Sequence, residues 1–342
     1  MKPKPILSDR QIDRQKSIDI IKGICILFII ITHYSWSDSE RLRLLFPFWV
    51  DMAVPIFMII SGYVNANSFR KKNITSLLKS YNKQYVFKRL IRYTSPFIIA
   101  FCIEIFAIII KSEFNYSLIE IIYLYLQGGI GPGSYYYPVL LQFIVVFPII
   151  YHIIRIYDYK GLFYCFIINV SYEILKSAYM MNEECYRLLI FRYVFLIAFG
   201  CYFAIGKTHI KNLYFVFAIL FSIIYIIIVK YFYVTPVITN YWSGTSIFAI
   251  FIVLPVVFLF NKKIYFKPIE ILGKSSYHIF LTQMVYYCSV ELIYSVIPNK
   301  YIQLLINIII CTLLGIVFYY FETFFSSFIL RHIIDNKSNY YK

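Results

Sequence analysis

Long apolar runs alternate along the chain with short polar segments that are rich in lysine and arginine. Met52 to Phe69 is an uncharged run of 18 residues, and Ile121 to Ile154 is one of 34. A helix that crosses a membrane needs about 20 predominantly apolar residues. The pattern predicts an all-α, polytopic transmembrane helical bundle of about ten spans. These lie at residues 18–36, 46–64, 93–110, 136–154, 161–176, 188–206, 213–230, 242–260, 275–293 and 301–322.

The composition strengthens the case for a membrane protein. Hydrophobic residues make up 61% of the 342 positions and charged residues 15%, against about 45–50% and 25% in soluble domains. A protein core does not need that much apolar material, so the excess is expected to face lipid. This excludes a soluble enzyme, a disordered chain and a secreted disulfide scaffold. Ten spans leave no loop long enough for a soluble domain, so residues 1–342 are expected to form one integral-membrane domain.

Neither a disulfide framework nor a metal site is predicted. The seven cysteines show no C-x-x-C pair and no Cys/His ligand spacing, and six of them fall in apolar runs, where cysteine is a small core residue. The first apolar run follows Lys16 without a small-residue cleavage site. We therefore expect this run to remain as the first span.

The basic residues are distributed unevenly between alternate loops. The net charge of +16 would suggest nucleic acid in a soluble protein, but in a membrane protein it first reports orientation, and no nucleic-acid partner is expected. One side carries 24 Lys and Arg residues and the other 7. The richer side is cytoplasmic by the positive-inside rule, so both termini are predicted there, with tails at 1–17 and 331–342. Residues 65–92 are expected to form a basic, amphipathic cytoplasmic loop against the bilayer.

The first span contains three ionisable residues, which are costly inside a membrane and often functional. Asp19 and Lys22 are three residues apart and share one helical face. His33 follows Lys22 by close to three turns and lies on the same side. Lys22 could simply pair with Asp19 and extend to the interface, and His33 could be a capped residue near the opposite interface. Alternatively, a neutral imidazole there could act as a general base on a hydroxyl.

A second group of charges stands where the third span begins. Lys88, Arg89 and Arg92 lie within little more than one helical turn, and this arrangement suits a phosphate-bearing ligand because the guanidinium group binds phosphate through two hydrogen bonds. The alternative is the ordinary positive-inside bias. Glu104 follows within the same span, and Arg192 in the sixth span is a possible partner for it.

A glycine-rich segment at 128–133 precedes the fourth predicted span and could hide a re-entrant turn. Tyr135, Tyr136 and Gln142 come next. Aromatic residues at this depth usually form an interfacial belt, but they could also stack on a sugar at the mouth of a cavity.

Taken together, these stretches resemble the acyltransferase 3 family of integral-membrane O-acyltransferases, over most of the chain. The resemblance rests on motifs in a fixed order: Ser17–Gly23 followed by His33, Val54–Phe57 with Ser61–Tyr63, Lys88–Arg92 with Pro96, Tyr135–Gln142, Phe195–Gly200 and Gly273–Leu281. Two positions depart from the family pattern. Lys22 stands where arginine is usual, and Gln283 stands where the motif of the ninth span usually ends in histidine.

The resemblance implies transfer of an acyl group from cytoplasmic acyl-CoA to a hydroxyl of a cell-surface polysaccharide or lipid-linked glycan, in a bacterial inner membrane. On this reading acetyl-CoA is a donor substrate, and no permanently bound cofactor is expected. His33 would act on the acceptor hydroxyl as a base or be acylated transiently, with Lys22 and Asp19 along the thioester path. The donor phosphates would be held by Lys88, Arg89 and Arg92, and the acceptor would be contacted by Tyr135, Tyr136, Gln142 and Gln283. The alternatives are a transporter or flippase for a lipid-linked sugar and a glycan-binding membrane protein without catalysis.

Overall fold

The computed structural model describes residues 9–111, 116–207, 212–232, 265–288, 294 and 297–339. Within these ranges the regular structure is entirely helical. The predicted span at 242–260 and part of the one at 275–293 lie outside the described residues.

The other predicted spans each coincide with a helix. These helices are α1 (Asp9–Thr32), α3 (Ala53–Lys71), α5 (Lys83–Ile110), α7 (Tyr136–Tyr157), α8 (Tyr159–Ala178), α10 (Val194–Ile205), α11 (Asn212–Tyr231), α14 (Ser276–Tyr287) and α16 (Lys300–Asn339). Shorter elements connect or precede them: α2 (Asp38–Arg43), η1 (Phe46–Phe48), η2 (Val50–Met52), α4 (Leu77–Ser80), α6 (Leu118–Gln127), α9 (Glu183–Leu188), η3 (Ile190–Tyr193) and α13 (Lys267–Lys274).

Within the described residues, four helical segments are long and apolar enough to cross a membrane, namely Phe46–Lys71, Leu77–Ile110, Tyr136–Tyr157 and Lys300–Phe325. Their outer surfaces support this reading. On α16, Leu313, Val317 and Phe321 are each about 60% exposed, although large apolar side chains are normally buried in a soluble protein. Such a continuous apolar surface is typical of a helix that faces lipid. The chain is therefore a multi-pass membrane protein.

The structure differs from the predicted amphipathic loop at 65–92. Helix α3 continues to Lys71 and α5 begins at Lys83, so only a short connection with the four-residue helix α4 separates them. Both spanning helices continue through basic residues beyond their apolar parts. A fall in hydropathy therefore does not mark where these helices end. A second difference is α6, whose start is marked by a capping box between Ser117 and Glu120.

Close backbone packing between helices organises the core. Helix α3 packs against α10, and α1 packs against α13. A Cβ atom on Gly62 would lie 2.1 Å from the carbonyl oxygen of Ile197, and one on Gly200 would lie 1.9 Å from that of Ile59. Only glycine fits at these two crossings, as is usual where membrane helices approach closely.

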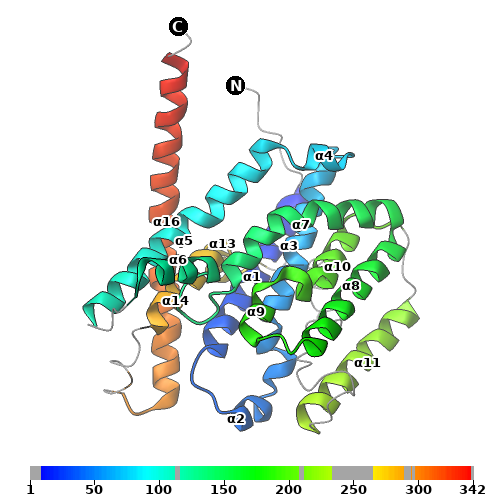
Figure 1. Cartoon of the computed structure of the whole chain (residues 1–342), viewed down its shortest axis with the longest axis horizontal. Helices are drawn as coiled ribbons and strands as arrows, with labels where there is room; N and C mark the ends of the chain where they lie inside the picture. The colour runs from blue at the N-terminus through cyan, green and yellow to red at the C-terminus, as the bar shows by residue number, and fades with distance from the viewer. Residues whose placement is uncertain are drawn as a thin grey trace.

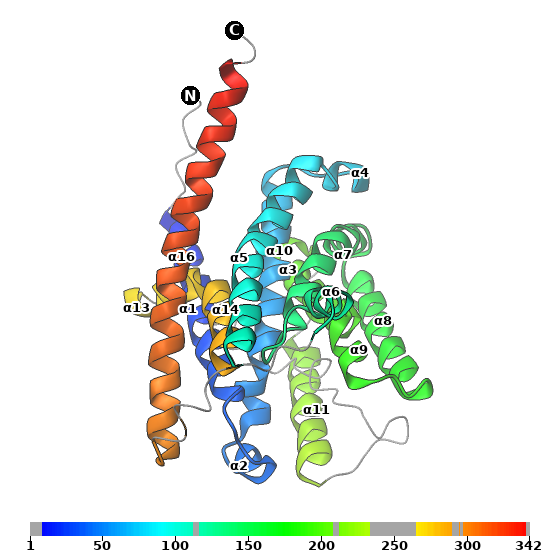
Figure 2. The same cartoon turned by 60° about the vertical axis from the view of Figure 1, so that its left-hand side comes forward.

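The long helices run between two ends of the molecule. Helix α4 and the last turns of α16 lie at one end, which we call the α4 end, and α2 lies at the opposite end, the α2 end (Figures 1 and 2). Helix α1 runs from the first toward the second. At the α2 end, Lys300 of α16 donates a hydrogen bond of 2.6 Å to Glu40. This contact, together with hydrogen bonds from Ser37, lowers the pKa of Glu40 to about 2.

Candidate active site

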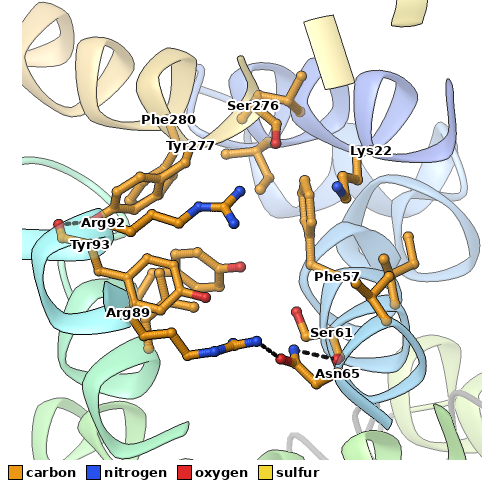
Figure 3. Close-up of a pocket in the computed structure, with 16 residues that line it drawn as sticks. Lys22, Phe57, Ser61, Asn65, Arg89, Arg92, Tyr93, Ser276, Tyr277 and Phe280 are labelled. Atoms are coloured by element: carbon orange, nitrogen blue, oxygen red, sulfur yellow. Dashed lines mark hydrogen bonds between the residues drawn. The ribbon is translucent and has the colours of Figure 1, made fainter. Parts of the chain in front are cut away.

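Two cavities lie along α1 and its C-terminal end, and we name each after one residue that it contains, Lys22 of α1 and His33, which directly follows α1. The Lys22 cavity has a volume of about 150 Å³ and lies among α1, α3, α5, α7 and α14 (Figure 3). Its polar lining consists of Lys22, Ser61, Asn65, Arg89, Arg92, Tyr93, Tyr136, Ser276 and Tyr277, and its apolar lining includes Ile26, Phe57 and Phe280.

Three cations reach the Lys22 cavity, and they are held differently. The Lys22 amine lies 3.2 Å from the Asp19 carboxylate. The Arg89 guanidinium donates to the Asn65 amide oxygen and lies over the ring of Tyr85. Arg92 has no hydrogen bond or ion pair with any residue that the structure describes, and its guanidinium points toward Lys22 across the cavity (Figure 3). The cavity therefore presents free N–H donors to an anion.

Two further residues of the predicted donor site lie outside this cavity. Asp19 is buried behind Lys22 and reaches the cavity only through that ion pair. Lys88 lies in a separate groove near α4, where Lys72, Lys79 and Lys83 are also found. The structure thus brings Lys22, Arg89 and Arg92 together and leaves Lys88 on an adjoining basic surface.

The His33 cavity lies nearer the α2 end and has a volume of about 560 Å³. It shares Ile29, Tyr136 and Phe280 with the Lys22 cavity, so these three side chains form a wall common to both cavities. The remainder of its lining is more polar and includes Thr32, Trp36, Asp38, Arg41, Asp51, Tyr135, Glu183, Arg187, Arg192, Tyr193 and Lys230.

A hydrogen-bond chain fixes the orientation of His33. Its Nδ1 lies 3.0 Å from Oε1 of Gln283 in α14, and Nε2 of Gln283 lies 3.5 Å from the carbonyl oxygen of Pro132. A carbonyl oxygen only accepts, so the Gln283 amide nitrogen belongs on that side and its oxygen faces the imidazole. In this assignment Nδ1 carries the proton and donates a hydrogen bond to Oε1 of Gln283. The lone pair is then on Nε2 of His33, where it can accept a proton.

The glycine-rich segment is held against this site by Glu104. The Glu104 carboxylate accepts hydrogen bonds of 3.2 Å from the backbone N–H groups of Ile130 and Gly131. Gly133 lies so close that a Cβ there would be 3.1 Å from Cε1 of His33. The suggested pairing of Glu104 with Arg192 is therefore wrong, because the carboxylate binds backbone donors instead.

The residues predicted to contact the acyl acceptor fall into two groups. Tyr135 and Tyr136 line the His33 cavity. Gln142 does not reach it, because its amide donates to the carbonyl of Leu188 at 2.7 Å and accepts from the N–H of Ile190 at 3.0 Å. Gln283 is fully buried behind His33. Its place in the structure is that of a residue that positions the imidazole.

Sequence reasoning missed several neighbours of the site. Arg192 lines the His33 cavity inside a group of tyrosine rings, and the partner of Glu104 is a loop backbone. The charge of Arg192 inside an apolar run was a usable signal. The contact between His33 and Gln283 joins residues 250 positions apart, and no local pattern contains it.

The arrangement offers two different chemistries on either side of a thin wall. Cationic donors in one cavity can hold an anionic group, and an oriented imidazole in the other can remove a proton from a hydroxyl. Ile29, Tyr136 and Phe280 line both cavities, so a group that displaced or passed between these side chains would reach from one cavity to the other.

Comparison with known families gives one match. The sequence profile described as the acyltransferase domain of the acyltransferase 3 family matches residues 15–331, which include both cavities. Searches of curated proteins and of solved structures gave no significant match. The match covers most of the chain, so it confirms the resemblance that the motifs predicted. The chain belongs to the acyltransferase 3 family, and it is a membrane acyltransferase.

Proposed function

We propose that the protein is an O-acetyltransferase that moves an acetyl group from cytoplasmic acetyl-CoA to a hydroxyl of a cell-surface polysaccharide or lipid-linked glycan. The observation that carries this proposal is the pair of cavities along α1. One contains the cations Lys22, Arg89 and Arg92, the other contains His33, and both use Ile29, Tyr136 and Phe280 as a common wall.

The donor would enter at the α4 end. Arg92 and Arg89 would bind the diphosphate of coenzyme A, with Arg92 free to make two hydrogen bonds to phosphate oxygens. The nucleotide part is too large for about 150 Å³, so it would extend over the basic groove that contains Lys88. The pantetheine arm would then point along α1, past Lys22, toward the shared wall.

The length of this path matches the chemistry. His33 follows Lys22 by eleven residues, which is about 16 Å along a helix at 1.5 Å per residue. An extended pantetheine arm has a comparable length. The thioester could therefore reach the His33 cavity while the nucleotide remains at the α4 end.

The transfer step would use His33 as a base. Nε2 takes the proton of the acceptor hydroxyl while the oxygen attacks the thioester carbonyl, and collapse of the tetrahedral intermediate breaks the C–S bond. The departing thiolate then takes the proton from the imidazolium, so the products are the O-acetyl ester and coenzyme A. Alternatively, His33 could carry the acetyl group transiently and then pass it to the same hydroxyl, and this route gives the same two products. Gln283 would keep the ring in the required tautomer in either case.

The orientation follows from the charge count. The α4 end carries the segments that are rich in Lys and Arg, and it would face the cytoplasm of a bacterial inner membrane. The His33 cavity would then receive its acceptor from the side on which envelope glycans are assembled.

The proposal is tested with purified protein in nanodiscs, acetyl-CoA labelled in the acetyl group, and glycans extracted from the native envelope. The expected result is labelled ester on the glycan together with release of free coenzyme A. A transporter or a glycan-binding protein would leave the label on the donor. Absence of transfer, with donor binding intact, would contradict the proposal.

A further inference from the structure

Arg192 is a cation of the His33 cavity that has no role in the steps above. Arg192 lies in η3, immediately before α10, and lines this cavity together with Tyr135 and Tyr193. Its guanidinium carbon lies 4.8 Å from the ring centre of Tyr186, 4.9 Å from that of Tyr193 and 5.9 Å from that of Tyr135. These three tyrosines form what we call the tyrosine cage.

The hydrogen-bond donors of Arg192 are unused among the residues that the structure describes. Its Nε is buried without a hydrogen-bond partner, and no described carboxylate lies within ion-pair distance of the guanidinium. The nearby Glu173 accepts a 2.5 Å hydrogen bond from the hydroxyl of Tyr186, so the tyrosine stands between the two charges. An arginine has five N–H donors. Arg192 is partly exposed, but its buried Nε–H is unmet, and leaving a buried donor unmet is costly.

The other charges of the cavity are largely paired. Arg41 binds Asp51 at 2.5 Å, while Glu183 is shared by Arg187 at 3.0 Å and Lys176 at 2.7 Å. Arg192 is thus a fixed positive charge with free donors, at the wall of a cavity that also contains Lys230. Stacking on tyrosine rings holds a guanidinium in place without occupying its hydrogen bonds.

We propose that Arg192 recognises an oxyanion on the acceptor, so that the acceptor is an acidic glycan whose carboxylate or phosphate binds in the tyrosine cage while its hydroxyl lies at His33. This rests on the proposed acetyl transfer and adds the chemical class of the acceptor. A bidentate contact to a carboxylate or phosphate would satisfy the unused donors. The anion would also fix which hydroxyl of the sugar reaches Nε2.

Binding of small probes tests the anion site separately from catalysis. Methyl β-glucuronide, its uncharged methyl ester and glucose 6-phosphate are titrated into the protein in nanodiscs. The intrinsic tryptophan fluorescence, to which Trp36 at the cavity wall contributes, is followed. At least one acid should bind about tenfold or more tightly than the ester, since a hydrogen-bonded charge contributes about that much. Which acid binds more tightly distinguishes a carboxylate from a phosphate. Equal binding of the ester and both acids would overturn the proposal.

Variants show whether Arg192 is the cause. R192Q should abolish the preference for the acids, and R192K should restore it in part, because the charge remains but the planar fork is lost. R43Q is the matched control, since it removes an exposed arginine on α2 that does not line the cavity. Acetyl-CoA binding at the Lys22 cavity reports that each variant is folded. An unchanged preference in folded R192Q would overturn the proposal.

The transfer assay distinguishes the two proposals. Envelope glycans are separated by anion exchange into neutral and acidic fractions, and wild-type protein should label the acidic fraction, with KM raised about tenfold or more in R192Q. Equal labelling of both fractions, unaffected by R192Q, would overturn the acidic acceptor and leave acetyl transfer standing. No labelling of either fraction, with donor bound, would overturn acetyl transfer itself.

Discussion

At the scale of single residues, Arg92 and Arg89 make different contributions to the Lys22 cavity. Arg89 is bonded to Asn65 and stacked on Tyr85, whereas Arg92 has no such contact among the described residues. We expect Arg92→Ala to weaken acyl-CoA binding about tenfold to a hundredfold without loss of stability, because charge-assisted hydrogen bonds contribute about 1.5–3 kcal/mol. Arg89→Ala should lower both binding and thermal stability. Titration of acyl-CoA at two salt concentrations measures the affinity of each variant, and Lys160→Ala is the control. If both arginine variants bind acyl-CoA as tightly as the wild type, the two arginines serve only to orient the protein in the membrane.

Gln283 is the second residue for which the structure makes a specific prediction. Replacing it with leucine would leave the Nδ1–H of His33 without an acceptor and release the tautomer. We expect Gln283→Leu to lower the rate of acetyl transfer by about a hundredfold, within the range of general-base contributions, while acyl-CoA affinity stays constant. Gln283→His, which keeps an acceptor there, should retain most of the activity. Equal rates for the leucine variant and the wild type would show that the hydrogen bond to Gln283 does not orient the base.

These residues also show what a single sequence can provide. The pairing of Lys22 with Asp19 and the shared face of Lys22 and His33 follow from helical spacing, and both were predicted. The contact of His33 with Gln283 was not, because helical periodicity shows which residues share a face and says nothing of which helix faces it. The position of Gln142 was not foreseen for the same reason: its partners are the last residue of α9 and the first residue of η3.

At the scale of elements, the glycine-rich segment before α7 depends on α5. Glu104 accepts from two backbone N–H groups of this segment, and Gly133 touches His33. Glu104→Ala would leave two donors unsatisfied, at about 1–3 kcal/mol for each buried group. We expect a lower melting temperature and slower transfer, with unchanged donor affinity at the Lys22 cavity. Glu104→Gln, which keeps one acceptor, should be intermediate. A fully active alanine variant would show that Glu104 does not support the His33 site.

Most helices could be predicted because a span must be long and apolar, and this is a local property. The limits of α3 and α5 could not, since both helices continue through basic residues that have good helix propensity. Helix α6 was missed because its ten residues are too short for a span. Which helices pack together, such as α3 and α10, depends on glycines at the crossings. The sequence does not indicate which helix each of these glycines contacts.

At the scale of the whole molecule, acyl-CoA can reach the Lys22 cavity only if the α4 end faces the cytoplasm. The last turns of α16 lie at that end (Figures 1 and 2), and the charge count predicts that both termini are cytoplasmic. A cytoplasmic reporter fused after Lys342 should therefore be active, and a reporter that matures only outside should be inactive. A fusion within α2 should give the opposite pattern. Activity outside for the first fusion would reverse the orientation and put the donor cavity on the wrong side for acyl-CoA.

The most direct test of the central claim is the rate of acetyl transfer by His33→Ala in nanodiscs, measured with labelled acetyl-CoA and the acceptor glycan at saturation. Alanine cannot take the hydroxyl proton, so we predict a loss of about 10²–10⁴-fold, with acyl-CoA affinity and thermal stability unchanged because the Lys22 cavity does not include His33. A variant that keeps more than about a tenth of the wild-type rate would fall short of the loss of a general base, and would contradict the assignment of His33 as the residue that carries the chemistry.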